Sequence, residues 1–435
     1  MLVPEVYEEP LPEGAKPTAK KAFRAVSDLP DVLPIKLKTD LTDEEKKVSD
    51  DAGQLLPHPD QQPLNFEVST AEDKQRLLNN FERVEFRKVS YTLPILIIYN
   101  PSSGKSVNMI PMIEARLQKE NIQFEMMPTQ KALDTYQFAK DADLDKYSLV
   151  VAAGGDGSYH EVVNGMLARS DKKKLPVALI PNGSGNDTCR SLGFNTLDDA
   201  LNNIVNAEVV KCDTIRTLLD YATEEEVPKD QESQLNHCRH MVINAGFACP
   251  ANITREAQKY KRCCGTNCYN VATLQEAILG RMKNFTYECE LDGQKREDVA
   301  SIVFMVANGK YTGGGMMCDP FAVMNDGMFD LMYVSDPKVQ SLMGVADILG
   351  KAHKKGGIHI YDKTCTFLRA KKIKFTLKGI QGRTPDKEGS LGAQSICIDG
   401  ELISYNKSIT MEIVPNNVEF CIGRQKFDED YKIFV

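Results

Sequence analysis

The sequence predicts an α/β domain, with a parallel sheet covered by helices, followed by a mainly antiparallel β domain. Between about residues 93 and 211, apolar runs of strand length alternate with segments of helical periodicity, which is the pattern of a parallel sheet. Two glycine-rich turns in this region each follow directly on an apolar run. After residue 238, short strand-like runs are separated by Gly or Asp turns, as in an antiparallel domain. The chain has 435 residues, which is enough for two such domains.

The expected segments follow these changes along the chain. Residues 1–90 are rich in Pro, Asp, Glu and Lys, so we expect a flexible extension, with a short helix around residues 70–86. We expect the α/β domain at 91–215 and the antiparallel domain at 216–405, with a solvated acidic insertion at 220–235 and a last segment at 406–435.

The strands and helices of the first domain can be predicted in order. LPILIIYN, at residues 93–100, is the first convincing strand, and a helix follows at 109–122 with Ile110, Ile113 and Leu117 on one face. The next two strands are YSLVVAA at residues 147–153 and LPVALI at residues 175–180. Both are short apolar runs bounded by polar sequence, which indicates strands that are buried in a parallel sheet.

The first glycine turn, GGDG at residues 154–157, lies between a strand and a segment with Val162, Val163 and Met166 at helical spacing. The unpaired N–H groups and the dipole at the start of such a helix favour an anion, and glycines let the backbone approach a phosphate. Asp156 would repel that phosphate unless a cation lay between them. We therefore predict that Asp156 binds Mg²⁺ that bridges to a nucleotide, directly or through water.

The second glycine turn, Asn182 to Gly185, follows the next strand and is also accompanied by an acid, Asp187. Either turn alone is equally typical of an ordinary connection between a strand and a helix. Two such turns in tandem, each with an acid, favour a site that handles phosphate.

Composition excludes several other classes of protein. The net charge of −8 disfavours nucleic acid as a partner, because its backbone attracts basic surfaces. No apolar run approaches the length of a membrane span, and the acidic N-terminus does not resemble a signal peptide. The twelve cysteines form no disulfide pattern, which indicates reduced thiols and a cytoplasmic location. Zinc binding by Cys263, Cys264 and Cys268 is disfavoured because the spacing is irregular.

Seven motifs occur in order along the chain: YNPSSGK (99–105), GGDGSYHEVVNGM (154–166), PNGSGNDTCRSLG (181–193), KCDTIR (211–216), INAGF (243–247), YTGGGMMCDPFAVMNDGMFD (311–330) and IDGE (398–401). Together they resemble the motifs of lipid kinases that share the diacylglycerol kinase catalytic domain. This group includes diacylglycerol, sphingosine and ceramide kinases. The resemblance covers about residues 93–422 and implies an NAD kinase-like first domain, a β-sandwich second domain, and last strands that return to the first domain.

The resemblance also implies which residues contact ATP. Gly104, Lys105 and Ser106 imitate the end of a Walker A loop, but the first glycine of that motif would fall at Tyr99, so we exclude a P-loop. Ser158 and Ser184 stand where most members have Thr, and each keeps a hydroxyl. The nucleotide-binding residues implied are Asn100, Pro101, Ser102, Ser103, Gly104, Thr129, Gly154, Gly155, Asp156, Gly157, Ser158, Tyr159, His160 and Ser184.

Transfer of a phosphoryl group needs charge neutralisation and a base for the acceptor hydroxyl. The resemblance assigns the first task to Mg²⁺ held by Asp156, Asp187 and Asp213, if these converge. Glu401 matches the proposed general base, although from the sequence alone the Asp399-Gly400 turn is more typical of a solvent-facing hairpin. Asp156 remains an alternative base.

A second metal site is implied at Asp326, with the backbone carbonyls of Val323 and Met328, by its match to a structural Mg²⁺ site in bacterial diacylglycerol kinases. Without the resemblance, an Asx turn would be the preferred interpretation. The glycines at 313–315 are equally compatible with a loop that lines the acceptor cleft and with a plain connector.

We therefore expect an ATP- and Mg²⁺-dependent kinase that phosphorylates a primary hydroxyl of diacylglycerol or of a sphingoid or ceramide-type lipid. Ala248 and Cys249 stand where sphingosine kinases place an acid, which disfavours sphingosine. The basic segment at residues 351–359 is a candidate for transient contact of a cytoplasmic protein with a membrane surface. Homodimerisation stays open. The alternatives are a kinase of a soluble acceptor, like NAD kinase or phosphofructokinase, and a catalytically silent lipid- or nucleotide-binding protein.

Overall fold

The computed structural model describes residues 86–422 apart from 102–105, 184, 321, 335–341, 354–358, 360–361, 363 and 388–389. For residues 106–107, 261–263, 266, 342–343, 345–346 and 349 it describes the backbone only. It also describes four short strands nearer the N-terminus, which form two antiparallel pairs: β1 (Glu5–Val6) with β2 (Lys21–Ala22), and β3 (Val32–Pro34) with β4 (Asn65–Glu67). The helix predicted around residues 70–86 falls outside the described residues, except for Phe86.

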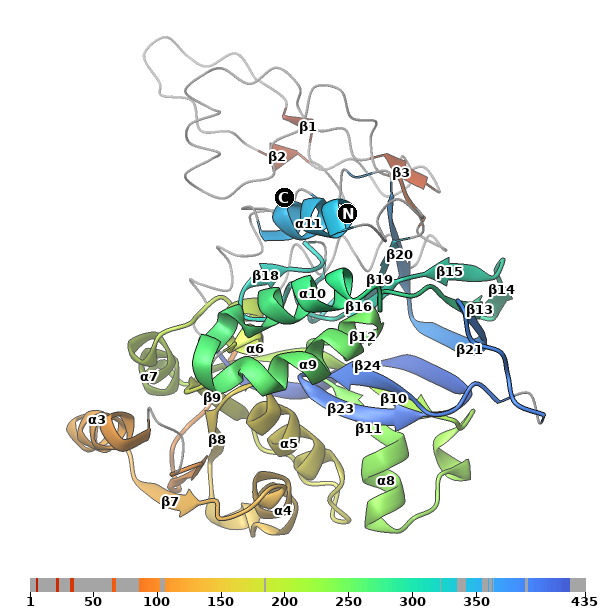
Figure 1. Ribbon diagram of the computed structural model, residues 1–435. Coiled ribbons are helices and arrows are strands. Elements are labelled where there is room, and N and C mark those ends of the chain that lie inside the picture. Colours follow the sequence, from red (N-terminus) through yellow and green to blue (C-terminus); the bar gives the residue numbers. More distant parts are fainter. Residues whose placement is uncertain are drawn as a thin grey trace.

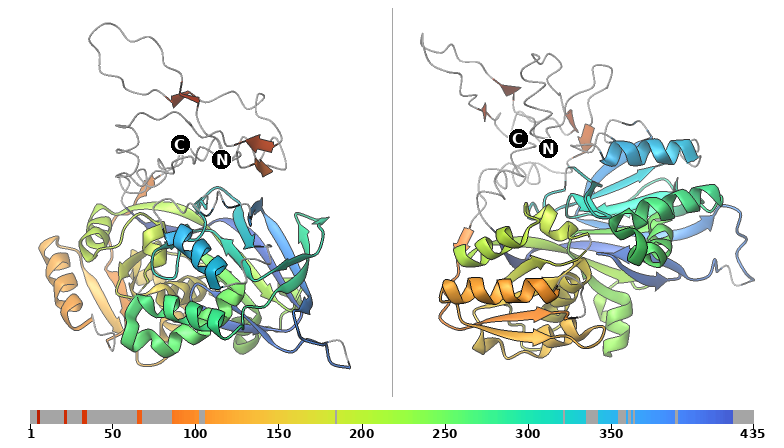
Figure 2. Two further views of the ribbon diagram at one scale, coloured as in Figure 1. Left: turned by 45° about the horizontal axis from the view of Figure 1, so that its top comes forward. Right: turned by 60° about the vertical axis from the view of Figure 1, so that its left-hand side comes forward.

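The first part of the molecule is a parallel sheet with helices on both faces (Figure 1). The strand order is β9-β8-β6-β7, and all three pairings are parallel. Helices α3 and α7 pack together on one face, and α4 packs with α5 on the other (Figure 2). The strands are β6 (Ile95–Tyr99), β7 (Phe124–Pro128), β8 (Leu149–Gly154) and β9 (Val177–Pro181). The helices are α3 (Ser106–Lys119), α4 (Asp134–Asp141), η2 (Leu144–Lys146), α5 (Asp156–Leu167), α6 (Asp187–Ser191) and α7 (Leu197–Asn206).

The apolar content of these elements explains their place. Every residue of β8 and β9 is buried, as expected for strands that are covered on both faces. Ile113 and Leu117 of α3 are buried, and Ile110 packs against the same core. The predicted order of strands and helices in this part is therefore confirmed.

The second part is a sandwich of two antiparallel sheets. Its six-stranded sheet has the order β20-β19-β16-β12-β22-β23, and a larger sheet faces it. Between them, the ring centroids of Phe247 and Phe304 lie 5.0 Å apart, and Phe375 of the other sheet lies 5.0 Å from Phe247. The first sheet comprises β12 (Asn244–Ala248), β16 (Val303–Ala307), β19 (Phe329–Val334), β20 (Cys365–Ala370), β22 (Gln394–Ile398) and β23 (Glu401–Tyr405). The facing strands are β10 (Glu208–Leu219), β11 (Cys238–Met241), β13 (Phe285–Leu291), β14 (Gln294–Lys295), β15 (Val299–Ser301), β21 (Lys372–Ile380) and β24 (Ser408–Cys421).

Two long strands join the two parts into one continuous sheet. β24 pairs with β21 and β10 of the sandwich, and its end pairs in parallel with β9 of the first part. β10 also pairs with β5 (Phe86–Lys88). The boundary expected between residues 215 and 216 falls inside β10, which runs unbroken from Glu208 to Leu219. The two-part fold class is confirmed, but the parts are not separated by a linker at that point.

Helices in the second part were missed by the sequence analysis. α9 (Cys249–Cys264), η4 (Gly265–Asn267) and α10 (Cys268–Ile278) form a helical hairpin, and α11 (Leu342–His353) lies beside α10. They cover the face of the six-stranded sheet that is turned away from the sandwich core. The expected acidic insertion holds η3 (Glu224–Glu226) and α8 (Gln231–His237), whose first turn is capped by the side chain of Asp230.

A short pairing of β17 (Tyr311–Thr312) with β18 (Met316–Met317) encloses the glycines at 313–315. No helix in the described part of the chain is both long enough and apolar enough to pass through a membrane.

The contact between α4 and α5 leads to a test of the packing. A Cβ atom at Gly165 of α5 would overlap the carbonyl oxygen of Tyr136 and lie 3.0 Å from the Cβ of Ala139. We expect Gly165→Ala to lower the free energy of unfolding by about 1–3 kcal/mol, because the helices must move apart. Gly350→Ala in α11 is the matched control, since a Cβ there meets nothing within 4 Å. The control should leave stability unchanged or raise it by up to about 1 kcal/mol. Equal effects of the two changes in urea unfolding would contradict this packing.

Candidate active site

The two glycine turns meet at one edge of the parallel sheet. β8 and β9 are neighbours in register, with Gly154 opposite Pro181, so both chains leave the sheet at the same place. Their backbones are in direct contact, since a Cβ atom at Gly183 would lie 2.6 Å from the Cα of Gly155. Asn186, at φ 55°, closes the second turn by accepting from the N–H of Gly183 and donating to its carbonyl. No side chain fits between the turns, so glycine is required at both positions.

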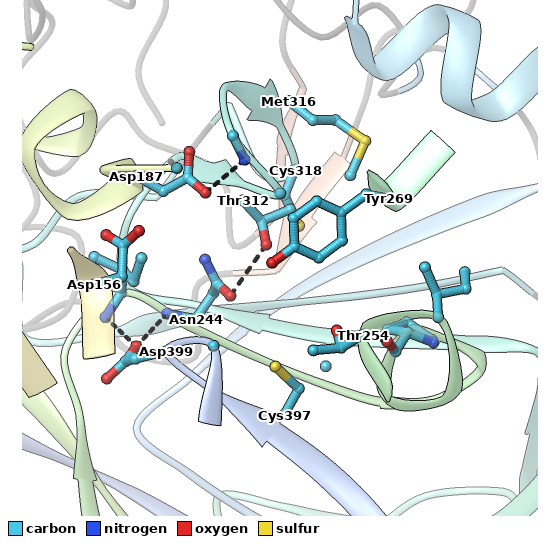
Figure 3. Close-up of a pocket in the computed structure, with 18 of the residues that line it drawn as sticks. Asp156, Asp187, Asn244, Thr254, Tyr269, Thr312, Met316, Cys318, Cys397 and Asp399 are labelled. Carbon is cyan, nitrogen blue, oxygen red and sulfur yellow. Dashed lines mark hydrogen bonds between the residues drawn. The ribbon is translucent and has the colours of Figure 1, made fainter. Parts of the chain in front are cut away.

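A cavity of about 870 Å³ opens at this edge and extends into the second part of the molecule. At one end it is lined by Asn100, the glycine turns, Asp156, Asp187 and Glu401. Figure 3 shows Asp156 and Asp187 on one side of this cavity and Tyr269 and Met316 on the other. The cavity is therefore shared between the α/β part and the sandwich with its helices.

Asp156 and Asp187 lie close together, as the resemblance implied. A Cβ atom at Gly185 would lie 3.0 Å from Oδ2 of Asp156 and 3.3 Å from Oδ2 of Asp187. Oδ1 of Asp156 accepts from the backbone and hydroxyl of Thr188, at 2.8 and 2.9 Å. Asp187 accepts from the N–H groups of Gly314 and Gly315, both at 2.8 Å. Burial, and then the neighbouring charge of Asp156, raise the pKa of Asp187 to about 7.

The glycines at 313–315 are therefore part of the site. Two of them hold the carboxylate of Asp187, and Gly313 and Gly314 line the cavity. Of the two interpretations that the sequence left open, the structure favours a loop of the cleft over a plain connector.

Glu401 reaches the cavity from a hairpin of the second part. Asp399 and Gly400 form the turn between β22 and β23, with φ of 49° and 91°. The hairpin predicted from Asp-Gly is present, but its tip faces the glycine turns. A Cβ atom at Gly157 would lie 2.8 Å from Oε1 of Glu401, so this carboxylate rests on the first turn of α5. Burial and the nearby Glu401 raise the pKa of Glu161, which also lines the cavity.

Asp399 fixes that hairpin to both parts of the molecule, a role that the sequence analysis did not assign. It is 2% exposed, and its oxygens accept from the N–H groups of Val242, Ile243 and Asn244 at 2.7, 2.9 and 3.1 Å. Oδ2 also pairs with Nδ1 of His160 in α5, at 2.8 Å. Asp-Gly is a common sequence in hairpin turns, so the sequence gave no sign that Asp399 also accepts from distant backbone N–H groups.

The side chains of His160 and Tyr159, which the resemblance implied as nucleotide contacts, are bonded to other groups of the protein. Arg239 donates to Nε2 of His160 at 3.1 Å. Because arginine can only donate, Nδ1 must carry the hydrogen that His160 donates to Asp399. The hydroxyl of Tyr159 donates to the carbonyls of Gly154 and Ile180 at the ends of β8 and β9. Both side chains are fully buried, and neither lines the cavity.

The other predicted nucleotide contacts divide into three groups. The first group lines the cavity and comprises Asn100, Gly154, Gly155, Asp156, Gly157 and Ser158. Pro101 is exposed, and Thr129 is buried at the end of β7, where its N–H donates to Tyr99; neither lines the cavity. Ser102, Ser103, Gly104 and Ser184 lie outside the described residues.

Asp213 does not join the other two acids, which differs from the expected convergence of three carboxylates. It sits at a bulge in β10, where the register shifts between Cys212 and Thr214. Its two oxygens accept from the N–H groups of Gly327 and Asn416, both at 2.7 Å. This buried side chain therefore ties β10 to the 324–327 loop and to β24, and it is not among the cavity residues.

Asp326 is also engaged elsewhere. Its Oδ1 accepts from the N–H of Met328 at 3.0 Å, which is an Asx turn. Its other oxygen pairs with the guanidinium of Arg369, and Nε of Arg369 lies 2.8 Å from Asp330. All three charged groups are buried, as are Val323 and Met328. The resemblance implies Mg²⁺ beside Asp326, but the structure places an arginine cation there, which favours the Asx turn.

The far end of the cavity is mainly apolar. It lies between the outer face of the six-stranded sheet, which presents Met305 and Met332, and helices α9, α10 and α11, which present Ile253, Tyr269 and Ile348. Cys318 and Cys397 also line it. Sequence analysis missed this wall because it expected an antiparallel domain of strand-like runs and assigned no element to the segments that form α9, α10 and α11.

The donor set near the glycine turns fits a nucleotide phosphate and a hard cation. The first N–H groups of α5 lie beside Gly155 and Gly157, which have no side chains to cover the backbone. Asp156 and Asp187 supply two carboxylates, which suit Mg²⁺ together with phosphate oxygens and water. Within the described ranges, no three His, Cys, Asp or Glu side chains form a group that could hold a metal by themselves.

Comparisons with known proteins agree with this arrangement. Residues 94–217 match the model of the diacylglycerol kinase catalytic domain, and residues 241–421 match that of the YegS C-terminal NAD kinase beta sandwich-like domain. The diacylglycerol kinase of Bacillus subtilis (strain 168) is 26% identical over 283 residues, 64% of this chain and 84% of that protein. That of Staphylococcus carnosus (strain TM300) is 27% identical over 271 residues, 61% and 81% of the two chains.

Solved structures share the fold. A diacylglycerol kinase structure from Bacillus anthracis str. Sterne matches with a TM-score of 0.52 and 16% identity, covering 79% of this chain and 99% of that one. Another solved chain from the same strain has a TM-score of 0.59 and 19% identity, with 77% and 97% coverage. At these identities the likeness concerns the fold alone.

The raised pKa of Asp187 predicts a pH dependence of stability. An unfolded Asp releases its proton near pH 4, whereas folded Asp187 releases it near pH 7. Between these values the folded chain binds more protons than the unfolded chain, so the free energy of unfolding falls as the pH rises. We expect urea unfolding of the metal-free chain to show this decline from about pH 5 to about pH 8. Asp187→Asn should reduce the slope, because it removes the titrating group.

Asp171→Asn is the control for that measurement. Arg169 holds the pKa of Asp171 at about 2, below the interval, so this variant should keep the wild-type slope. Asp330, with a pKa raised to about 6 by burial, contributes equally in all three proteins. Identical slopes in wild type and Asp187→Asn would show that Asp187 is ionised throughout.

Proposed function

Because the chain belongs to the superfamily that shares the diacylglycerol kinase-type catalytic domain, we propose that it is an ATP-dependent lipid kinase. It transfers the γ-phosphate of ATP to a primary hydroxyl of diacylglycerol or of a sphingoid or ceramide-type lipid. We also propose that the metal is Mg²⁺, and that the protein is cytoplasmic and visits the membrane surface to reach its acceptor.

One observation carries this proposal: a single cavity has phosphate-type chemistry at one end and an apolar wall at the other. The glycine turns and the start of α5 suit the phosphates of a nucleotide. Met305, Met332 and Ile348 suit acyl chains. Glu401 projects between these two ends, over Gly157, where the acceptor hydroxyl of a lipid would meet the donor.

The side chains divide the work of the transfer. Mg²⁺, when bound with ATP, neutralises charge on the phosphates, and Asp156 and Asp187 would hold it. The first turn of α5 stabilises negative charge on the phosphate oxygens through its N–H groups. Glu401 accepts the proton of the acceptor hydroxyl, because it is exposed to the cavity. Asp156 is less suited as the base, since Thr188 holds one of its oxygens and the other faces Asp187 across Gly185.

The acceptor end of the cavity favours a lipid over the soluble acceptors. Away from the glycine turns its polar side chains include the uncharged Thr254, Tyr269 and Thr273, and its described lining contains two histidines, His353 and His359, but no lysine or arginine. A sugar phosphate or a dinucleotide would need basic groups there to pair with its own phosphates. The absence of a carboxylate among residues 249–254 also favours a neutral head group over the amine of sphingosine.

An assay of several acceptors tests the proposal. The purified chain is incubated with labelled ATP and Mg²⁺ in mixed micelles that contain diacylglycerol, sphingosine, ceramide or monoacylglycerol. Parallel samples contain NAD or fructose 6-phosphate without micelles. We expect label in diacylglycerol or ceramide. Label in none of the lipids would refute a lipid kinase, and label in a soluble acceptor would favour that alternative. ATP binding without any transfer would indicate a silent binding protein.

Two variants separate the base from the residue that positions it. Glu401→Gln should lower kcat by roughly 10²–10⁴-fold, with little change in ATP binding or stability, because it removes only the proton acceptor. Asp399→Asn should lower kcat and also the free energy of unfolding by about 1–3 kcal/mol, because its NH₂ group would face the donors of His160 and Val242. Full activity of Glu401→Gln would exclude it as the base.

A further inference from the structure

The outer face of α10 is the most unusual surface in the described part of the molecule. In the described part of the chain, seven large apolar side chains are exposed, and four of them lie between residues 271 and 279. Val271, Leu274 and Ile278 are 39%, 50% and 66% exposed. They are spaced three and four residues apart, so they form one stripe on the helix. Leu279, 50% exposed, follows directly at its end.

This helix has the reverse of the usual arrangement for a surface helix. In a globular protein the apolar stripe normally faces the core and the polar residues face water. On α10 the buried residues are Thr273 and Glu276 together with the small Cys268 and Ala272, whereas the large apolar side chains of the stripe face outward. Thr273 lines the cavity, together with Tyr269 near the start of the helix. One face of α10 is therefore a wall of the acceptor end, and the opposite face exposes the large apolar side chains of the stripe.

The charge around the stripe has one sign. Residues 249–284 hold six basic and two acidic residues, in a chain with a net charge of −8. Both acids, Glu256 and Glu276, are buried and pair with Lys259 and Arg281. The exposed charged side chains that the structure describes in this segment are all basic: Arg255, Lys259, Arg281 and Lys283. An exposed apolar stripe flanked by cations has the chemistry of a helix that lies in the interface of an anionic membrane.

We propose that the α9–α10 hairpin is the membrane-docking surface of this protein, and that its partner is an anionic phospholipid bilayer. Val271, Leu274, Ile278 and Leu279 enter the interface, and Lys259, Arg281 and Lys283 meet the lipid phosphates. The purpose of docking rests on the proposed lipid acceptor: α10 separates the bilayer from the acceptor end of the cavity, so a lipid would enter beside this helix. Figure 1 shows α9 and α10 side by side on the outside of the six-stranded sheet.

The basic segment that the sequence suggested for this contact is less suited. Residues 354–358 lie outside the described residues, and Lys351 pairs with two carboxylates, Asp347 and Asp362, whereas Lys259 and Arg281 each pair with one. The docking surface therefore lies on a hairpin that the sequence analysis did not single out.

Vesicle binding of the full chain tests the proposal without ATP. Sedimentation is measured with phosphatidylcholine vesicles with and without roughly a third phosphatidylserine, which supplies the negative surface. Leu274→Gln with Ile278→Gln should weaken binding to the anionic vesicles by roughly ten-fold or more, because the apolar stripe is lost. Met112→Gln on α3, 54% exposed, is the matched control and should bind like the wild type.

A second pair of variants tests the charges. Lys259→Gln with Lys283→Gln should weaken binding to anionic vesicles by roughly ten-fold, and less so at high salt. The control pair is Lys146→Gln with Lys295→Gln, which removes two exposed lysines from other surfaces. If the two pairs weaken binding equally, the attraction comes from overall charge and the proposed surface is wrong.

A fluorescent reporter shows directly whether α10 enters the bilayer. The chain contains no tryptophan, so Leu274→Trp introduces a single one. Its emission should shift to shorter wavelength when anionic vesicles are added, because the indole leaves water. Met112→Trp should show no shift. The proposal is overturned if the emission of Leu274→Trp is already at shorter wavelength without vesicles and if Leu274→Gln with Ile278→Gln changes only the oligomeric state. The stripe would then be a contact between copies of this chain.

Failure of docking can be distinguished from failure of the kinase proposal. The α10 variants should lose activity on diacylglycerol in vesicles but keep it on short-chain diacylglycerol dispersed in solution. Normal vesicle binding and activity in these variants would overturn the docking surface alone. Binding that depends on α10, with no phosphorylation of any lipid, would refute the kinase and leave the docking surface in place.

Discussion

The buried carboxylate of Asp399 is the constraint on which the arrangement of this molecule depends. It accepts from three consecutive backbone N–H groups of the second part and from His160 of the first part. A buried carboxylate is costly unless its oxygens are satisfied by such donors. Satisfying it requires α5, the start of β12 and the β22–β23 hairpin to meet at one point. That meeting places Glu401 over the glycine turns.

The same site shows how one chain assigns different tasks to acids of the same type. Asp399, Asp213 and Asp326 are held by backbone N–H groups or by an arginine, and so they stabilise the fold. Asp187 is also held by N–H groups, but it faces Asp156, and the pKa of Asp187 is raised. Two carboxylates that repel one another at the edge of a phosphate site attract a cation, whereas a carboxylate with enough donors does not.

The six-stranded sheet of the second part has two faces with different roles. Its inner face packs aromatic rings into the sandwich core. Its outer face, with Met305 and Met332, is covered by helices that leave a cavity. Among these helices, α10 carries polar groups toward the cavity and apolar groups toward the outside. The cavity over the outer face of the sheet and the outward-facing apolar stripe of α10 therefore lie at the same acceptor end.

Local patterns in the sequence determined the parallel sheet and both glycine turns, and the resemblance implied that Asp156 and Asp187 converge. The structure gives the reason for their proximity, because β8 and β9 are adjacent and end at one edge. The resemblance added Glu401. Tertiary structure alone decided that His160 and Tyr159 face the core, that Asp213 ties strands together, and that Arg369 lies beside Asp326. Apart from the contact of Tyr159 with Gly154, these pairs are separated by tens to hundreds of residues, and no local spacing encodes them. Whether an acid binds a metal or a backbone depends on the donors that the fold brings to it, and these come from distant segments.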